Sequence, residues 1–242
     1  MKKKLLIYGG GSLISEELIK IYEKKNFEFV IFCRNKENFE KFILKNSFET
    51  YKFNIFETDI QNLNQNLEMI AQIKDDLTGI IWVAGYTGDP DDEYLNIAKC
   101  KENLEVNMMN PILLINELSK KVIKSQNSFI VIFTSVAGLR GRAKRLIYSA
   151  SKSGLISYSS GLRQKFNKEG INILTIIPGY MNTKPFNIKT FKFLISEPNE
   201  VAKLVYSAVK NKKNVIYINS LWRLIMFVIR LIPEKIYKNL NF

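Results

Sequence analysis

The chain has 242 residues, of which 46% are hydrophobic and 12% aromatic, so we expect a globular core, and a disordered chain is excluded. It contains no histidine, which excludes imidazole general bases and nearly all ordinary zinc sites and leaves tyrosine, lysine, serine and carboxylates for acid–base chemistry. The formal net charge of +13 is explained either by a general excess of lysine or by attraction to anions such as cofactor phosphates, phospholipid headgroups or nucleic acid.

Apolar runs that predict strands alternate with amphipathic stretches that predict helices along the whole chain. The predicted strands are Lys4–Tyr8, Glu28–Cys33, Glu49–Asn54, Gly79–Ala84, Phe129–Thr134, Asn172–Ile177 and Val215–Ile218. The predicted helices are Ser12–Lys25, Leu63–Lys74, Asn96–Ser125, Leu146–Lys168 and Glu197–Lys210. Continuous apolar strands are typical of a parallel sheet covered by helices on both faces. We therefore expect an α/β fold, a doubly wound (Rossmann) parallel sheet of about seven strands, in a single domain over residues 1–242.

A glycine cluster follows the first predicted strand. In a dinucleotide-binding fold, a glycine turn at this place brings backbone N–H groups and a helix N-terminus against a pyrophosphate. The alternative is a plain glycine turn, but the position between a strand and an amphipathic helix favours a phosphate-binding loop. We expect cofactor contacts here from Gly9, Gly11, Ser12, Leu13 and Ile14.

The second predicted strand ends in basic residues. A carboxylate at this place would accept hydrogen bonds from an adenosine ribose 2′-hydroxyl, whereas Arg34, with Lys36 nearby, offers positive charge suited to a 2′-phosphate. The alternative is a solvated basic loop. We predict NADP(H) rather than NAD(H) as the cofactor, with Arg34 and Asn35 close to its adenosine ribose.

Tyr148 and Lys152 lie four residues apart in a predicted helix, which puts both side chains on one face, one turn apart. A fixed ammonium group favours the phenolate and lowers the pKa of the tyrosine, so that the phenol becomes a better proton donor. The pair alone also arises by chance in a lysine-rich chain. Ser135, at the end of an apolar run upstream, makes the pattern more specific.

With these motifs the chain resembles the short-chain dehydrogenase/reductase family over nearly its whole length. The family's catalytic asparagine, serine, tyrosine and lysine correspond to Asn107, Ser135, Tyr148 and Lys152. The resemblance implies that the serine binds the substrate carbonyl, the tyrosine donates a proton, the lysine also holds the nicotinamide ribose, and the asparagine holds a water that links the lysine to solvent.

The resemblance implies further cofactor contacts outside the glycine turn. These are Asp59, Ala84, Gly85, Pro178, Gly179 and Thr183, of which the last is expected to contact the nicotinamide carboxamide. Two features depart from the common family pattern. Leu13 and Ser15 replace the second and third family glycines, and Val83 replaces the asparagine of the usual Asn-Ala-Gly.

Four cations lie between Ser135 and Tyr148, in a loop that borders the substrate cleft in the family. We expect Arg140, Arg142 and Arg145, beside Lys144, to bind substrate phosphate, although a solvated loop or a subunit contact is the alternative. Residues 134–142 resemble the branch of decaprenylphosphoryl-2-keto-pentose reductases. That resemblance implies a polyprenyl-phosphate-linked keto-sugar substrate in cell-envelope polysaccharide biosynthesis and a partner oxidase. Alternatives are a nucleotide-sugar or 3-oxoacyl substrate, or a non-catalytic dinucleotide-binding regulator.

Residues 220–242 form an apolar and basic C-terminal extension. The segment 221–233 is too short to span a bilayer, which takes roughly 20 apolar residues, but as a helix it could lie in the membrane interface. Packing on the core or on another subunit is the alternative. Cys33 and Cys100 show no metal or redox spacing, so we expect a cytoplasmic protein without a metal, with peripheral contact to the inner face of the membrane. Family analogy implies a homo-oligomer, and the absence of a base-reading motif argues against nucleic acid.

Overall fold

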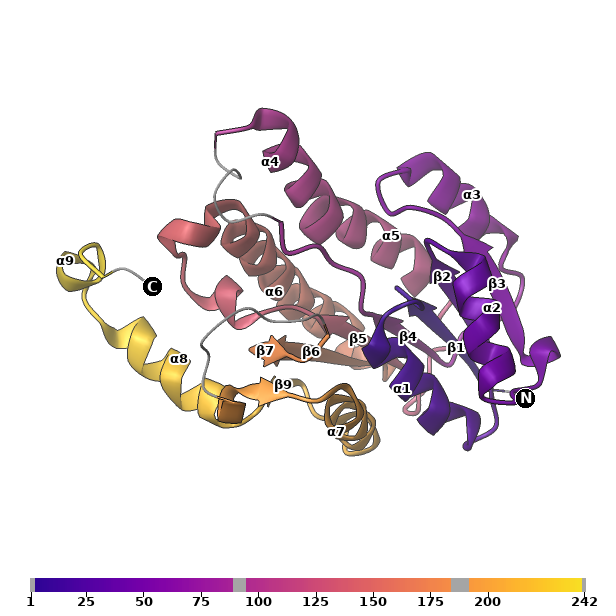
Figure 1. Cartoon of the computed structure of the whole chain (residues 1–242). Coiled ribbons are helices and arrows are strands. Elements are labelled where there is room, and N and C mark those ends of the chain that lie inside the picture. Colours follow the sequence, from indigo (N-terminus) through magenta and orange to yellow (C-terminus); the bar gives the residue numbers. More distant parts are fainter. Residues whose placement is uncertain (1–2, 89–94, 184–191, 241–242) are drawn as a thin grey trace.

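The chain forms a parallel seven-stranded sheet with helices on both faces (Figure 1). The computed structural model describes residues 3–88, 95–183 and 192–240. In the order in which they lie in the sheet, the strands are β3 (Phe53–Glu57), β2 (Phe27–Cys33), β1 (Lys3–Tyr8), β4 (Gly79–Trp82), β5 (Phe129–Phe133), β6 (Asn172–Pro178) and β9 (Val215–Ile218). The expected doubly wound fold is therefore confirmed. The strand order reverses between β1 and β4, which is where such sheets bind ligands.

Two buried clusters lie on the two faces of the sheet because side chains alternate along each strand. Leu5 and Ile7 of β1 belong to the first cluster, whereas Leu6 and Tyr8 belong to the second. The first cluster is covered by α1 (Leu13–Glu23), α2 (Lys36–Lys45) and α7 (Pro198–Lys210), and the second by α3 (Leu63–Gln72), α5 (Asn110–Ser119) and α6 (Leu146–Phe166). With both faces covered, the carboxyl ends of the strands are the place left for a ligand.

The third strand lies later in the chain than the sequence predicts. Residues 49–54 were expected to form it, but Thr50–Lys52 form a 3-10 turn and β3 begins at Phe53. Pairing with β2 sets this register, in which the Phe29 and Phe53 rings stack with their centres 4.9 Å apart. The prediction was wrong because the pattern of the segment alone does not contain these cross-strand contacts.

Helix α2 was not predicted. Asn35 caps it by accepting a hydrogen bond from the backbone N–H of Asn38 at 2.7 Å, and Phe39, Phe42 and Ile43 form its buried face. A capping residue followed by apolar residues at helical spacing is a recognisable signal. The sequence therefore contained the information for this helix.

The long helix expected over residues 96–125 is divided. It consists of α4 (Ile97–Leu104), a π-helical turn over Glu105–Met109 and α5. It ends at Ser119, and Val122 then forms a parallel bridge with Leu77. A π-turn inserts an extra residue into a helix and is often found at functional sites.

The C-terminal part of the chain lies at one end of the sheet, beyond β6. Two short parallel strands, β7 (Tyr180–Met181) and β8 (Ile195–Ser196), precede α7, and α8 (Leu221–Leu231) and α9 (Glu234–Tyr237) follow β9. Figure 1 shows α8 and α9 in yellow, at the opposite end of the molecule from α2 and α3. Within the described ranges, no helix is both long enough and apolar enough to cross a membrane.

Candidate active site

The glycine turn after β1 is held by its own hydrogen bonds. Gly9 has a φ of 97°, in the left-handed region that favours glycine. Ser12 caps α1 by accepting a hydrogen bond from the N–H of Ser15 at 3.1 Å, and the Ser15 hydroxyl donates to the Gly9 carbonyl at 2.8 Å. Gly11 is exposed, and a Cβ atom built there would meet nothing within 4 Å. The turn is therefore preformed and open at Gly11, as the close approach of a pyrophosphate requires.

The two residues that follow the turn differ in what they offer a ligand. Leu13 is exposed, whereas the side chain of Ile14 is buried in the core, so that Ile14 can contribute only its main chain. Arg34 is exposed at the carboxyl end of β2, with Asn35 beside it as the cap of α2. No ion pair of Arg34 is seen in the described part of the chain, and its charge is therefore available to an anion.

A polar group that the sequence analysis missed lies on the other side of the turn. The Tyr8 hydroxyl donates to Asn66 Oδ1 at 2.6 Å, and Asn66 Nδ2 donates to the Asp59 carbonyl at 2.8 Å. Burial, and secondly the charge of Asp59, raise the pKa of Tyr8, so that the phenol stays protonated as a donor. Asn66 thus fixes the segment that carries the exposed carboxylate of Asp59. In the sequence, the only sign of this role was that Asn66 is a polar residue within the predicted helix 63–74.

Lys152 lies next to Gly85 together with Asn107, and it also lies close to the ring of Tyr148. A Cβ atom built on Gly85 would lie 3.0 Å from Lys152 Nζ and 3.2 Å from Asn107 Oδ1. Lys152 Nζ lies 5.7 Å from the centre of the Tyr148 ring. Lys152 is only 4% exposed, and burial lowers its pKa to about 8. Lys152 and Asn107 of the predicted catalytic set therefore lie together next to the loop that follows β4, and Lys152 also lies close to the Tyr148 ring.

The π-turn places Asn107 in that space. Its carboxamide pairs with the main chain of Tyr86: Oδ1 accepts from the N–H at 2.9 Å, and Nδ2 donates to the carbonyl at 2.7 Å. Nδ2 also donates to Asn103 Oδ1 at 3.0 Å, and the Ser151 hydroxyl donates to the same oxygen at 3.3 Å. Asn107 thus fixes the loop that contains Gly85, and fully buried Asn103 and Ser151 connect it to α6. Sequence reasoning missed Asn103 although it precedes Asn107 by one helical turn.

Ser135 is brought next to α6 by a close backbone contact. Its hydroxyl accepts a hydrogen bond from the N–H of Ala137 at 3.1 Å and caps the 3-10 turn over Val136–Leu139. A Cβ atom built on Gly138 in this turn would lie 2.6 Å from the carbonyl carbon of Lys152. The absence of a side chain at Gly138 therefore sets how closely Ser135 approaches the helix that carries Tyr148.

Gly138→Ala is expected to push this turn away from α6. The added methyl group would overlap backbone atoms, which cannot rotate aside, so we expect a loss of about 1–3 kcal/mol in the free energy of unfolding and a lower turnover rate. Urea denaturation and steady-state rates measure the two effects. Gly141→Ala is the matched control, because a Cβ atom built there meets nothing within 4 Å. Equal behaviour of the two variants would contradict the role given to Gly138.

Arg140 is used within the protein. Its Nη1 donates to the carbonyls of Ile229 and Ile232, the latter at 2.7 Å, its Nη2 pairs with Glu234 at 3.0 Å, and its guanidinium lies 3.7 Å from the centre of the Tyr237 ring. The prediction that Arg140 binds substrate phosphate is corrected accordingly. The guanidinium attaches the end of α8 and α9 to the loop after β5, and we leave it out of the substrate site.

The other predicted substrate arginines differ from each other. Arg145 Nη1 donates to the carbonyls of Thr87 and Gly88, at 2.7 and 3.1 Å, so it holds the loop after β4. Nε of Arg142 is buried, and no hydrogen-bond partner for it is found among the described residues. Within the described ranges, Arg142 thus differs from Arg140 and Arg145 in making no hydrogen bond to a main-chain carbonyl.

The expected nicotinamide end of the site lies after β6. Pro178 ends the strand, and Gly179 lies against the Trp222 ring of α8. The N–H of Thr183 donates to the Met181 carbonyl at 2.8 Å, and residues 184–191 beyond it lie outside the described part. The N–H of Ala84 donates to the Tyr8 carbonyl at 3.1 Å, so the start of the loop after β4 is held next to the end of β1. No three His, Cys, Asp or Glu side chains of the described ranges are grouped to hold a metal ion.

Known proteins match both the sequence and this architecture. The model of the short chain dehydrogenase family matches residues 3–214. A ketoacyl reductase named HetN from Nostoc sp. is 29% identical over 193 residues, covering 74% of this chain and 67% of the relative. A 3-oxoacyl-[acyl-carrier-protein] reductase from Bos taurus is 26% identical over 193 residues, covering 76% and 77%.

Solved structures show the same fold. The structure described as ElxO with NADP bound superposes with a TM-score of 0.80 at 20% identity, covering 93% of this chain and 100% of that one. The structure of BdcA in complex with NADPH superposes with a TM-score of 0.73 at 19% identity, covering 89% and 93%. At these identities the likeness concerns the fold. The relatives named above are ketoacyl and 3-oxoacyl reductases, so the narrower resemblance to keto-pentose reductases is not shown.

Proposed function

We propose that this chain, which belongs to the short chain dehydrogenase family and is an oxidoreductase of that type, uses NADPH to reduce a ketone to an alcohol. The observation that carries the proposal is that buried Lys152 lies beside the Tyr148 ring and, together with Asn107, next to Gly85 in the loop after β4. A catalytically silent dinucleotide-binding regulator has no need for a buried lysine beside a tyrosine.

The residues present fit a dinucleotide. The open turn at Gly11 and the N-terminus of α1 suit the pyrophosphate, and Arg34 suits a 2′-phosphate. Gly85, Lys152 and Thr183 would border the nicotinamide. When bound, the reduced cofactor supplies the hydride that this protein's own side chains do not provide. The structures of ElxO with NADP bound and of BdcA in complex with NADPH, which share this fold, agree with this choice.

The side chains divide the proton chemistry among them. Tyr148 donates a proton to the oxygen of the ketone as negative charge develops there. Lys152 stabilises the phenolate that remains, because its ammonium group is held close to the ring in a buried place of low polarity. Ser135 donates a hydrogen bond to the same oxygen, and Asn107 keeps the loop of Gly85 in position.

The substrate class favoured by the relatives is a 3-oxoacyl thioester. A phosphate-bearing keto-sugar, such as one linked to a polyprenyl phosphate, is the second candidate. It is favoured by Arg142, whose Nε has no partner among the described residues, and by the nearby exposed Lys144. Loss of NADPH absorbance should be followed with a 3-oxoacyl thioester, with a keto-sugar phosphate and with each candidate absent. Turnover of the thioester alone supports the first candidate, turnover of the sugar alone supports the second, and turnover of neither contradicts the proposed substrates.

Arg34→Asp is expected to raise the Michaelis constant for NADPH by about 10- to 100-fold, while that for NADH changes little or falls. The arginine is exposed at the end of β2, where the added carboxylate would repel a 2′-phosphate and accept from a 2′-hydroxyl. Initial rates with both nucleotides measure the effect. Lys25→Asp makes the same charge change beyond the far end of α1 and serves as the control. If Arg34→Asp affects NADPH and NADH equally, the 2′-phosphate assignment is rejected.

A further inference from the structure

Helix α8 has an apolar face that the described part of the chain does not cover. Trp222 and Met226 face inward and pack against Val136 and Ile177. On the opposite side Phe227 and Leu231 are 62% and 65% exposed, and the outward face also includes the exposed residues Leu221, Leu224 and Val228. The side of a helix opposite its buried face is normally polar, so the exposed apolar side chains indicate that something docks on this face.

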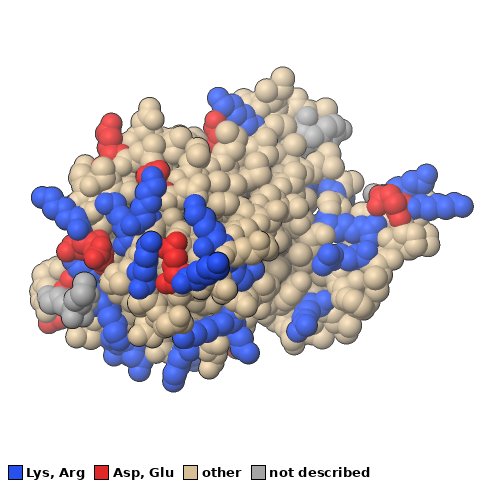
Figure 2. Space-filling view, turned by 180° about the vertical axis from the view of Figure 1, so that it is seen from behind, with Lys and Arg blue, Asp and Glu red and all other residues tan. Residues whose placement is uncertain are grey.

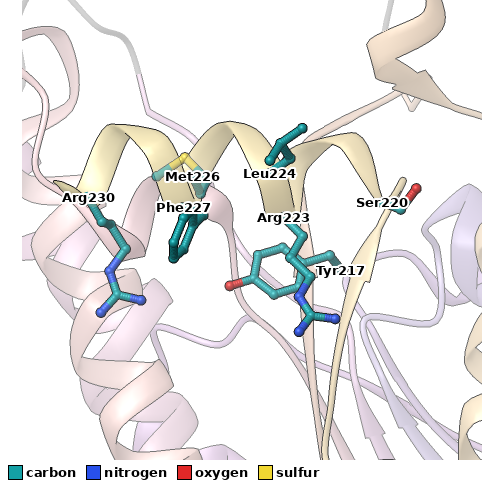
Figure 3. Close-up of a pocket in the computed structure, with 7 residues that line it drawn as sticks. All are labelled: Tyr217, Ser220, Arg223, Leu224, Met226, Phe227 and Arg230. Atoms are coloured by element: carbon teal, nitrogen blue, oxygen red, sulfur yellow. The ribbon is translucent and has the colours of Figure 1, made fainter. Parts of the chain in front are cut away.

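Two arginines flank this apolar face. In Figure 3, Arg223 and Arg230 point to the same side of α8, with the rings of Phe227 and Tyr217 between them. These side chains and Ser220 line a groove of ≈ 330 Å³. The helix itself contains no aspartate or glutamate. The occupant of the face is therefore expected to combine apolar surface with negative charge.

The spacing of the arginines favours an extended anionic surface over a single anion. The two arginines are seven positions apart in the helix, so their Cα atoms lie roughly 10 Å apart along its axis. This is farther than one phosphate group spans. Apolar residues beside arginines on a short helix are typical of a helix that lies in the membrane interface. We propose that α8 docks this protein on the surface of a membrane that contains anionic phospholipids.

A second copy of the chain fits the face less well. Each copy would bring two arginines and no carboxylate on α8, so contact between the two helices offers no opposite charge. An 11-residue helix is also only about 16 Å long, which gives little area compared with the roughly 800 Å² per partner of a stable interface. An anionic bilayer instead supplies the negative charge that the arginines lack on α8, and its interior can take up the exposed apolar side chains.

The surroundings of α8 agree with this docking surface. Lys235 and Lys238 are exposed after it, and the carboxylate of Glu234 is already paired with Arg140. Seen from behind, the end of the molecule that α8 and α9 form, at the right of Figure 2, carries basic side chains beside uncharged surface. The family model ends at residue 214, so this helix lies outside the part of the chain that the family match covers.

Co-sedimentation with vesicles tests the proposal. The whole chain should pellet with vesicles of phosphatidylcholine mixed with phosphatidylglycerol and stay in solution with phosphatidylcholine alone. Arg223→Gln combined with Arg230→Gln should lower the partition coefficient by about 25-fold, since each basic residue near an anionic surface contributes about fivefold. Phe227→Ser combined with Leu231→Ser should abolish binding even though the charge is kept. In Phe227→Trp, emission should shift to the blue on adding the anionic vesicles.

The controls separate docking from misfolding and from nonspecific charge. Lys24→Gln combined with Lys25→Gln removes the same charge beyond α1 and should leave binding unchanged. Thermal unfolding should be the same for the arginine variant and the parent, because both side chains point outward. Equal loss of binding in both charge variants, or pelleting that needs no phosphatidylglycerol, would overturn the proposal. So would a change of the α8 variants from oligomer to monomer in analytical ultracentrifugation, which would assign the face to a second copy.

Discussion

Tyr148→Phe is expected to lower the rate of ketone reduction by about 10²- to 10⁴-fold, while the affinity for NADPH changes little. The variant keeps the ring but removes the hydroxyl, which in our proposal is the proton donor to the ketone oxygen. Lys152 remains in place, since its contact is with the ring, at 5.7 Å from the ring centre. Single-turnover rates and a fluorescence titration with NADPH measure the two quantities separately.

Tyr158→Phe is the matched control, because Tyr158 lies on the same helix α6 and its hydroxyl donates to Asn116 Oδ1 at 2.9 Å, away from Gly85. Loss of that hydrogen bond should cost about 1 kcal/mol of stability and leave the rate unchanged. Retained turnover in Tyr148→Phe would reject Tyr148 as the acid. A loss of NADPH affinity as large as the loss of rate would show instead that the hydroxyl mainly binds the cofactor.

The sequence was sufficient to predict the sheet, and it also placed Tyr148 and Lys152 one turn apart on one helix. Continuous apolar runs predict strands that are buried on both faces of a sheet. Phe129–Phe133 is such a strand, and each of its five residues is buried. The four-residue spacing of Tyr148 and Lys152 also follows from helix geometry alone. Properties that depend on the residue pattern within a single helix or strand were therefore predictable.

Features fixed by contacts between distant elements were not. The carboxamide of Asn107 in the π-turn pairs with the main chain of Tyr86, which lies in the loop after β4 and forms no recognisable spacing with it. Arg140 appeared to be part of a phosphate-binding cluster, but its carbonyl partners come from Ile229 and Ile232, which are far away in the sequence. A cluster of arginines in a sequence shows where positive charge lies and does not show how much of it the chain itself uses.

Lys152→Met is expected to stop ketone reduction and, at the same time, to make the protein more stable. Lys152 is 4% exposed, and burial lowers its pKa from 10.5 to about 8. At pH 7 the ammonium group is charged in both the folded and the unfolded protein, so the folded state bears the full cost of burying the charge. Methionine fills a similar volume without a charge, and the free energy of unfolding at pH 7 should rise by about 3 kcal/mol.

The difference in stability between the parent and Lys152→Met should depend on pH. Between pH 8 and 10.5 the folded protein has released the proton of Lys152 while the unfolded chain still holds it, so the stability of the parent rises with pH in this window. Above pH 10.5 the lysine is neutral in both states, and the advantage of Lys152→Met should disappear. Urea denaturation of both proteins at about pH 7, 9 and 11 measures the difference in the free energy of unfolding. These pH values lie below, between and above the pKa values of Lys152 in the folded and the unfolded protein.

Lys165→Met separates the buried charge from a general effect of losing a lysine on α6. Lys165 is exposed near the end of the same helix, so its replacement should change neither the rate nor the stability by more than about 0.5 kcal/mol at any pH. If Lys152→Met is less stable than the parent at pH 7, the ammonium group has partners that offset its burial. If instead it is more stable but still active, Lys152 is not needed for the acidity of Tyr148. The expected combination, in which stability rises and catalysis is lost, would show that the fold accepts a buried charge at this place because the reaction requires it.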